Sequence, residues 1–511
     1  MIQRDGNNIS LWQTVRDEYH PMHFARADSF FDVIIVGGGI TGLSSALMLQ
    51  KAGKKCLILE AANLGFGTTG GTTAHLNTLL DTPYTTISKN FSEDASRMVA
   101  DAAAASINLI RKNIAEYQID CGFEDTDAYL YSENDMEDKE LDEVAVATTK
   151  AGVQLEFVDT IPISIPFTRA IRVPGQAKFN PIKYLQSIAT AFEAAGGIIM
   201  EHCRVDHVKD GEPVQVSTIK GSYTCTDLIY ATHIPPGINL LHLRCTPWRS
   251  YVIAVKLIGQ SYPDSLIYDM KDPYYYYRSQ VVRGELYLIA GGEDHKTGHT
   301  ENTEQSFARL EAHVRKNFKV SEVSHRWSSQ YFESADGLPY IGHLPGHAKH
   351  ILVGTGYGGN GMIYGNVAAM VFRSIILGEV SPYEKLFSPS RIKPIAGFTN
   401  FISQNVEVVK NLAGRLISAE KLSDLVDLSR GEGKVVTYNH EKIGIYKDDN
   451  GAIHAIDPTC THMKCGVKWN ASELSWDCPC HGARFSYEGK VLTGPADRDL
   501  EKIRIEELVS K

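Results

Sequence analysis

"FDVIIVGGGITGLSSALMLQKAG", residues Phe31–Gly53, predicts the fold of most of this chain. A short apolar run rich in β-branched residues leads into Gly37-x-Gly39-x-x-Gly42, and a segment with helical periodicity follows. The first glycine permits a tight turn, the second lets a pyrophosphate approach the backbone, and the third allows close packing of helix on strand. The helix start offers unpaired N–H groups to phosphate oxygens. The stretch predicts a nucleotide-binding α/β fold, and a glycine turn without a ligand is the alternative.

The second apolar run, "KKCLILEA", ends in Glu60, close to the ~20-residue spacing expected for an acid that binds a ribose hydroxyl. A carboxylate there would repel a 2′-phosphate, so NADP is not the expected nucleotide. NAD and FAD both remain open at this point.

Length and charge narrow the class of protein. With 511 residues the chain is too long for one core, and about two or three domains are expected. The net charge of −10 comes without a basic block, which argues against a nucleic-acid partner. No apolar run reaches the roughly 18 residues of a membrane span, and the N-terminus lacks an apolar signal core. We therefore expect a cytoplasmic protein without a membrane span; a homo-oligomer stays possible.

The secondary structure predicted from the sequence changes along the chain. Residues 1–390 read mainly as alternating strands and amphipathic helices, with a β-rich stretch at about 245–330 that predicts an inserted antiparallel substrate sheet. Residues 391–430 read as a helical linker. Short strands return over 431–511, which predicts an all-β domain.

That last domain contains two pairs of candidate metal ligands, Cys460-x-His462 and Cys478-x-x-His481. Two thiolates suit one iron of a binuclear cluster and two neutral imidazoles suit the other, which raises the potential toward about −150 to +300 mV. With "CTHMKCGVKWN" and "WDCPCHGARFSYEGKVLTGPA" around them, the pairs resemble the Rieske [2Fe–2S] domain. Tetrahedral zinc is the alternative, because two cysteines and two histidines also satisfy it.

The Rieske resemblance implies more about this domain. In Rieske proteins of cytochrome bc complexes, the positions of Cys465 and Cys480 form a disulfide; free thiols are the alternative, since a reducing cytosol opposes disulfides. Those proteins also place a serine and a tyrosine, which hydrogen-bond the cluster sulfurs, where this chain has Ala483 and Phe485. The loss of these donors predicts a lower cluster potential, which Ala483→Ser with Phe485→Tyr should raise.

Four further blocks lie between residues 30 and 390: "LGFGTTGGTTAHL", "FNPIKYLQSIATAFEAAGGIIMEHCRVDHV", "TDLIYATHIPP" and "DGLPYIGHLPGHAKHILVGTGYGGNGMIYG". Together with the glycine loop they resemble the FAD-dependent D-amino-acid oxidase-like family, which includes glycine and sarcosine oxidases. The resemblance selects FAD over NAD and implies a Rossmann-like domain of the glutathione-reductase type.

The same resemblance implies three sets of FAD contacts: Thr68, Thr69 and Gly70 at the pyrophosphate and flavin, the backbone of Val205 at the adenine, and Gly356, Gly361 and Met362 along the isoalloxazine. In some relatives a histidine just after the "GTT" triplet is bonded to the flavin. Gly71 takes that position here, so non-covalent FAD is expected, with His75 as a further candidate for a covalent bond.

In this family the protein orients the substrate, and an arginine is the usual anchor for its carboxylate. "DPYYYYRSQ" supplies Arg278 in the β-rich region, and the alternative is an aromatic strand face on which Arg278 is merely solvated or stacked. Further catalytic candidates are Tyr277, Tyr251 and Arg283. Strand alternation would place Tyr274, Tyr276 and Arg278 on one face.

Taken together, the two ends predict an FAD-dependent oxidoreductase. In this hypothesis an amine or amino acid loses hydride to FAD, and the electrons pass singly to the Rieske cluster and on to an unidentified acceptor. One alternative is a reductase that delivers electrons from NAD(P)H or ferredoxin to an oxygenase, but a second dinucleotide fingerprint is missing from the sequence. The other alternative is a non-enzymatic redox sensor.

Overall fold

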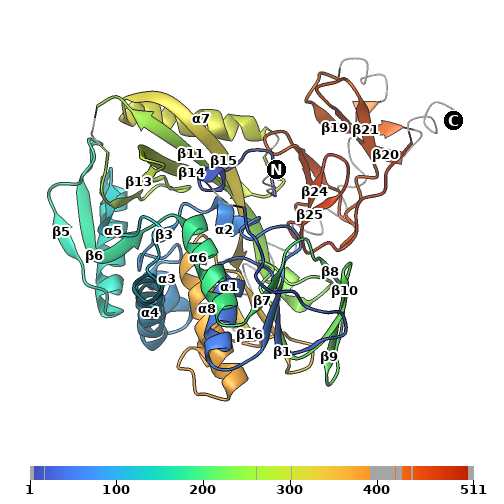
Figure 1. Ribbon diagram of the computed structural model, residues 1–511. Helices are drawn as coiled ribbons and strands as arrows, with labels where there is room; N and C mark the ends of the chain where they lie inside the picture. Colours follow the sequence, from blue (N-terminus) through green and yellow to red (C-terminus); the bar gives the residue numbers. More distant parts are fainter. Residues whose placement is uncertain are drawn as a thin grey trace.

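The computed structural model describes residues 5–15, 18–259, 262–300, 302–391, 420–421, 428–438 and 441–504. Within these ranges the chain forms a large N-terminal unit of helices and two sheets, with a smaller all-β C-terminal unit beside it (Figure 1). Most of the helical linker predicted over 391–430 lies outside the described residues. In the described part of the chain, no helix combines the length and apolar character that crossing a bilayer requires.

The first sheet is the nucleotide-binding sheet predicted from the glycine loop. Its strands run in the order β16 (Tyr340–His343), β17 (Ile351–Thr355), β10 (Gly221–Tyr230), β1 (Phe30–Val36), β2 (Cys56–Leu59) and β7 (Ile198–Met200). All neighbours on this path are parallel except β16 and β17. An antiparallel extension adjoins β10, made of β8 (Val205–Lys209) and β9 (Val214–Thr218).

Helices cover the face of this sheet that carries Val33 and Ile35, in one apolar cluster. They are α1 (Ile40–Lys51), α4 (Glu93–Tyr117), α6 (Pro181–Ala194) and α8 (Gly361–Leu377). The turn from β1 into α1 requires glycine, since Gly37 has a φ of +113° and a Cβ there would lie 2.5 Å from the Ala231 oxygen. The sequence of strand, glycine turn and helix thus folds as predicted.

The second sheet contains the β-rich stretch predicted to form the substrate sheet. Its order is β15 (Val320–Ser334), β11 (Cys245–Leu257), β14 (Glu285–Lys296), β13 (Tyr276–Val282), β12 (Leu266–Asp269), β4 (Glu124–Ser132), β6 (Arg169–Lys178) and β3 (His75–Leu76), with β5 (Glu156–Val158) beside β6. The sheet is antiparallel except that β12 runs parallel to β4. The predicted range of 245–330 supplies most of it, and residues 75–178 complete it, which the sequence pattern did not indicate.

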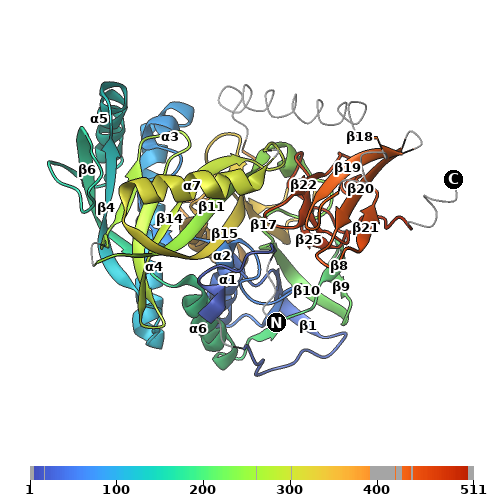
Figure 2. The same cartoon turned by 90° about the horizontal axis from the view of Figure 1, so that it is seen from above.

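Helix α7 (Thr303–Asn317) packs on one face of the second sheet, as Figure 2 shows from above. The remaining short elements of the N-terminal unit connect the sheets and helices. They are η1 (Gln13–Val15), α2 (Thr68–Gly71), α3 (Tyr84–Asn90), α5 (Asp135–Lys150), η2 (Leu240–Leu243) and α9 (Glu384–Phe387).

The C-terminal unit contains two four-stranded sheets. One has the order β18 (Glu420–Lys421), β19 (Gly433–Tyr438), β20 (Glu441–Lys447) and β21 (Ile453–Ile456). The other has the order β22 (Lys468–Asn470), β23 (Ser475–Asp477), β24 (Arg484–Ser486) and β25 (Val491–Thr493). The predicted fold class, an α/β nucleotide-binding domain with a β-sheet substrate region and a C-terminal all-β domain, is confirmed.

A buried group of charged side chains joins the two units. Arg484 lies 3.1 Å from Asp477 and 3.3 Å from Asp5 of the N-terminal segment. Arg249 of β11 approaches the same group, 3.5 Å from Asp477 and 3.9 Å from Glu473. None of these side chains is more than 4% exposed. Removing one partner of a buried ion pair typically costs about 3–5 kcal/mol, so these contacts hold the two units in one arrangement.

Candidate active site and metal centre

A cavity of about 1100 Å³ extends from the glycine loop to the second sheet and to the C-terminal unit. Its size matches the upper end of ligand pockets, about 300–1,000 Å³, and suits a dinucleotide together with a small substrate. Eight of the predicted cofactor residues line it: Gly37, Gly39, Glu60, Thr68, Thr69, Val205, Gly361 and Met362. The cavity therefore brings together residues from five separate stretches of the chain.

The glycine-loop end of the cavity fits FAD. Glu60 accepts a 2.7 Å hydrogen bond from the Gly38 N–H, which fixes the carboxylate at the cavity wall. A Cβ at Gly39 would lie 3.0 Å from Thr69 Oγ1, so glycine keeps the backbone open beside the start of α1. A helix start for the pyrophosphate and an acid for the ribose are the groups that an adenine dinucleotide requires.

Three predicted cofactor glycines do not line the cavity. A Cβ at Gly42 would lie 2.0 Å from the Gly37 oxygen, so Gly42 serves the packing of helix on strand that was expected of it. A Cβ at Gly70 would lie 2.1 Å from the backbone oxygen of Gly65, and Gly356 has a φ of +73° and faces β11 and β15. Gly70 and Gly356 thus lie outside the cavity lining, the backbone needs glycine at both positions, and the cofactor contacts predicted for them stay predictions.

The other end of the cavity is lined by aromatic rings and acids, and we call it the tyrosine chamber. Its walls are His75, Asn77, Asp81, Tyr268, Tyr274, Tyr276, Asp294 and Tyr331. The rings form one continuous group, with the His75 centroid 5.3 Å from Tyr268 and 5.5 Å from Tyr276. Burial, helped by Arg278 and Lys178, holds the pKa of His75 well below its usual range, so this ring is neutral.

The acids at this end are close to one another. Burial raises the pKa of Asp294 to about 7, although the Tyr331 hydroxyl donates a 2.8 Å bond to one of its oxygens. Burial also raises the pKa of Glu333 to about 7, with Asp81 and Asp294 adding to the effect. Asp81 accepts a 2.6 Å bond from the Gly359 N–H, just before α8. Negative charge in the chamber is therefore costly unless a cation joins it.

The structure corrects the predicted carboxylate anchor. Arg278 is fully buried outside the cavity and donates to Ala74 O at 2.8 Å and to Phe179 O at 3.0 Å. It donates also to Gln280 Oε1 at 2.8 Å, and its guanidinium lies 5.1 Å from the Trp12 ring. With these donors used inside the protein, Arg278 supports the chamber wall from behind and does not reach a substrate.

The two tyrosines predicted to act with Arg278 are also placed elsewhere. Tyr251 and Tyr277 are fully buried on the opposite face of the sheet, beneath α7. The Tyr251 ring packs 4.9 Å from Phe307, and the Tyr277 hydroxyl lies 2.6 Å from His313 Nε2. Arg283 is exposed in the turn between β13 and β14. None of these residues lines the cavity, whereas Tyr276, one residue from Tyr277, does line the chamber.

The predicted cluster ligands meet on two loops of the C-terminal unit, and all four are buried. The rings of His462 and His481 lie 5.1 Å apart, and the Cys460 thiol is next to that of Cys478. His462 Nε2 donates to Gly237 O at 3.1 Å, which leaves Nδ1 free for a metal. Nδ1 of both histidines is buried without a partner among the described residues.

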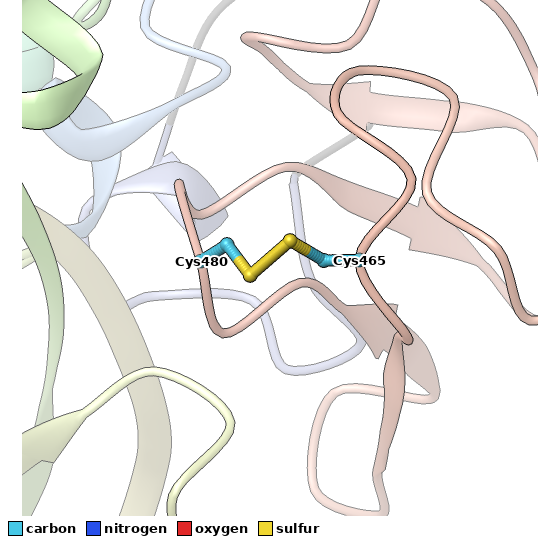
Figure 3. Close-up of a disulfide and its surroundings, with 2 residues drawn as sticks. All are labelled: Cys465 and Cys480. Atoms are coloured by element: carbon cyan, nitrogen blue, oxygen red, sulfur yellow. A yellow bond between two sulfur atoms is a disulfide. The ribbon is translucent and has the colours of Figure 1, made fainter. Parts of the chain in front are cut away.

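These donors fit a Rieske cluster, since burial lowers the pKa of His462 below its usual value and lowers that of His481 to about 3. Both imidazoles are therefore in the neutral form that binds iron. A disulfide joins Cys465 and Cys480 and ties the two loops together (Figure 3). The sulfurs of Cys478 and of this disulfide all lie within 4.8 Å of one another, so the bridge packs directly beside a ligand.

The cluster loop touches the wall of the cavity. Gly482, which follows the ligand His481, has a φ of +73°, and a Cβ there would lie 2.7 Å from the Pro247 side chain. Its carbonyl oxygen accepts a 2.9 Å bond from Gln330 Nε2. The backbone oxygen of Gln330 in turn accepts a 3.0 Å bond from Thr68 Oγ1, which lines the cavity. One residue thus links the cofactor cavity to the cluster loop.

Several of these residues were missed by the sequence reasoning. Gln330 and Asp294 carry no local motif, and the N-terminal segment was assigned no role, although the Asn7 N–H donates to Glu473 at 2.8 Å. Within the same segment Trp12 Nε1 donates to Thr72 O at 2.6 Å, beside the cavity. A tryptophan and polar residues ahead of the first strand were the only available hint.

Comparison with known proteins agrees with this geometry. The family model "FAD dependent oxidoreductase" (DAO) matches residues 32–374, and the Rieske [2Fe-2S] domain model matches residues 420–504. The chain belongs to the DAO family of FAD-dependent oxidoreductases and carries a C-terminal Rieske [2Fe–2S] domain. The predicted enzyme class and the two cofactors, FAD and the Rieske cluster, are confirmed. The match to the Rieske model favours an iron-sulfur cluster over the zinc alternative.

Similar proteins include one named as a Rieske iron-sulfur protein and one named as an oxidoreductase. The chain is 33% identical over 483 residues, 94% of each chain, to the putative Rieske 2Fe-2S iron-sulfur protein YhfW of Bacillus subtilis (strain 168). It is 26% identical to gamma-glutamylputrescine oxidoreductase of Escherichia coli (strain K12), over 73% of this chain and 90% of that one. A glycine oxidase crystal structure from Geobacillus kaustophilus matches with a TM-score of 0.60 and 16% identity, covering 71% of this chain and 99% of that one. That structure supports the fold alone.

Proposed function

We propose that this oxidoreductase oxidises a small amine or amino acid and passes the electrons one at a time through its Rieske domain to an external one-electron acceptor. Bound FAD would accept a hydride from the carbon next to the nitrogen, and the cluster would carry single electrons. The substrate becomes an imine, having lost two electrons and two protons, and water can then hydrolyse it. Cys460, His462, Cys478 and His481 would hold the cluster.

The observation that carries the proposal is the link from Thr68 through Gln330 to Gly482. Gln330 is 2% exposed, so water does not separate the cavity wall from the cluster loop at this point. Gly298 adds a second close approach, since its Cβ would lie 2.9 Å from Pro479 in the same loop. A Rieske domain that served an unrelated task would have no need of such contacts.

The residues of the chain have separate tasks in this proposal. The glycine loop and Glu60 bind the dinucleotide, and the tyrosine chamber orients the substrate and excludes water from it. The buried ion pairs around Asp477 keep the cluster loop against Gln330. Tethering the two centres in this way makes electron transfer independent of diffusion.

The proposal is tested on the purified holoprotein without oxygen. Candidate amines are added while the flavin absorbance and the EPR signal of the reduced cluster are recorded together. We expect flavin bleaching first and the EPR signal afterwards. In a Cys460→Ser variant with normal FAD content, bleaching should remain and the cluster signal should be absent.

Other outcomes would reject the proposal. Bleaching by NADH in the absence of an amine would support a reductase instead. Flavin that bleaches with an amine while the intact cluster stays oxidised would remove the electron-transfer step. A protein that responds to neither donor would fit a redox sensor.

A further inference from the structure

The tyrosine chamber has the shape of an aromatic cage. Tyr274 lies with its ring centroid 5.6 Å from Tyr276 and 6.4 Å from Tyr268, and the rings are tilted by 46° and 53°. His75 closes the group at 5.3 Å from Tyr268. These four rings line one cavity, and the electron-rich faces of tyrosine rings attract ammonium groups.

Polar atoms in the chamber wall are acceptors that lack a donor. Asn77 is 3% exposed, and its Nδ2 is used on the Tyr268 hydroxyl, whereas its Oδ1 has no partner among the described residues. The Tyr331 hydroxyl donates to Asp294 Oδ2, and the Ser250 hydroxyl also lowers the pKa of this acid, whereas the buried Oδ1 has no hydrogen bond of normal geometry from the described residues. Two buried acceptors without donors call for a ligand that donates, because leaving them unsatisfied costs about 1–3 kcal/mol each.

Positive charge is scarce in the cavity lining around Asp81 and Asp294, and Lys296, which acts on Glu333, lies outside that lining. Among the described residues that line the cavity, the cationic side chains are Arg204 and Lys490, and each has its own carboxylate nearby. Arg204 precedes β8 at the predicted adenine contact, and Lys490 belongs to the C-terminal unit. Arg278 is turned to backbone carbonyls. A substrate carboxylate would therefore meet Asp81 and Asp294 with no cation to bind.

We infer that the tyrosine chamber recognises the ammonium group of a cationic amine, free or N-methylated, on a substrate that presents no carboxylate to the chamber. The inference rests on the proposed function, because it names the substrate class of the same site. The ammonium lies against the rings, Asp294 supplies the opposite charge, and Asn77 Oδ1 accepts an N–H where the amine has one. The arginine clamp of an amino-acid site is replaced by acids and aromatic faces.

Binding of three small probes to the oxidised holoprotein tests this directly, by calorimetry and by the shift of the flavin spectrum. Tetramethylammonium carries the charge, tert-butanol has a similar size without charge, and glycine betaine adds a carboxylate to the cation. We expect tetramethylammonium to bind at least about tenfold more tightly than either of the others. Equal or tighter binding of betaine would overturn the inference, and so would equal binding of tert-butanol.

Variants locate the effect. Asp294→Asn should weaken tetramethylammonium about tenfold and leave tert-butanol unchanged. Asp142→Asn is the matched control, because Asp142 is an exposed partner of Arg169 far from the cavity lining, and it should change neither probe. Unchanged tetramethylammonium binding in Asp294→Asn would also overturn the inference. If that variant loses FAD, the relative affinities of the three probes for the wild-type protein still test the inference.

The outcome can be separated from that of the proposed function. Tetramethylammonium binding as expected, together with a cluster that never becomes reduced, would reject the electron path and keep the recognition site. Cluster reduction driven best by carboxylate-bearing amines would keep the electron path and reject the ammonium cage.

Discussion

At the interface between the two units Asp477 lies between Arg484 and Arg249, whereas Asp294 in the tyrosine chamber has no arginine or lysine of the described residues bonded to it. Burial alone would raise the pKa of both acids. The two arginines reverse this at Asp477, whose pKa falls below its ordinary value. At Asp294 the hydroxyls of Ser250 and Tyr331 lower the pKa too little to offset burial, and the pKa rises to about 7.

The opposite pKa shifts distinguish a carboxylate that stabilises the fold, Asp477, from a carboxylate that we expect to bind a ligand, Asp294. A buried carboxylate with its cations in place contributes to the interface and is chemically complete. A carboxylate held in a cavity without a cation costs stability, and a strongly shifted pKa in a cavity is typical of functional sites. The same residue type thus has opposite meanings in the two regions, and removing each should have opposite effects.

The largest effect is expected at the interface. Arg484→Met would leave Asp477 and Asp5 without their shared cation and should cost about 3–5 kcal/mol, measured as earlier denaturation of the C-terminal unit by guanidinium. Arg97→Met is the matched control, because its pair with Asp94 is exposed and worth at most about 1 kcal/mol. Similar losses in both variants would mean that burial at the interface is not what gives its ion pairs their value.

The disulfide should rank next. Replacing Cys465 and Cys480 by alanine removes a cross-link with a sequence separation of 15, worth about 3 kcal/mol in the chain-entropy model. Thermal unfolding of the holoprotein, with iron content checked, measures the loss. Reducing the wild-type protein should lower the melting temperature by a similar amount. A reduced protein that melts unchanged, with both thiols alkylated, would show that the bridge adds no stability to the cluster loops.

The two regions also differ in how far the sequence could predict them. Ligands such as Cys478 and His481 lie on one short loop, so their spacing reveals them, and the glycine loop is equally local. The chamber draws Asn77, Tyr276 and Asp294 from distant strands, so no short pattern contains it. Strand alternation correctly separated Tyr276 from Tyr277, but which face meets the cavity depends on where α7 packs.

Arg278 shows why chemical type alone misled the prediction. An arginine among tyrosines in the substrate sheet is the right residue for a carboxylate, and it does lie on the same face as Tyr276. Its donors are nevertheless used by Ala74 O and Phe179 O, carbonyl groups far away in the sequence. Hydrogen bonds to distant backbone cannot be seen in a pattern of residues, so the sequence could not show that this cation was already occupied.

A smaller effect is expected in the pH dependence of ligand binding. Tetramethylammonium keeps its charge at every pH, so a change in its affinity reports on the protein. Asp294, whose pKa is about 7, is mostly protonated at pH 6 and mostly ionised at pH 8. The affinity of the protein for tetramethylammonium should therefore rise about tenfold from pH 6 to pH 8. The acids that act on it, Asp81, Glu293 and Glu333, would broaden the transition. A flat profile would mean that Asp294 does not supply the charge.

The last prediction concerns stability, and its sign is the informative part. Because the pKa of Asp294 is raised from 3.8 to about 7, the folded protein binds more protons than the unfolded chain between these values, and stability falls as pH rises through this range. Asn cannot ionise, so Asp294→Asn should be more stable than wild type at pH 8 and no more stable at pH 4. Asp477→Asn, which removes a paired charge, should instead be less stable at pH 8. Chemical denaturation of the holoproteins compares them, and a loss of stability in both variants at pH 8 would show that Asp294 is as well paired as Asp477 and that the chamber does not await a cation.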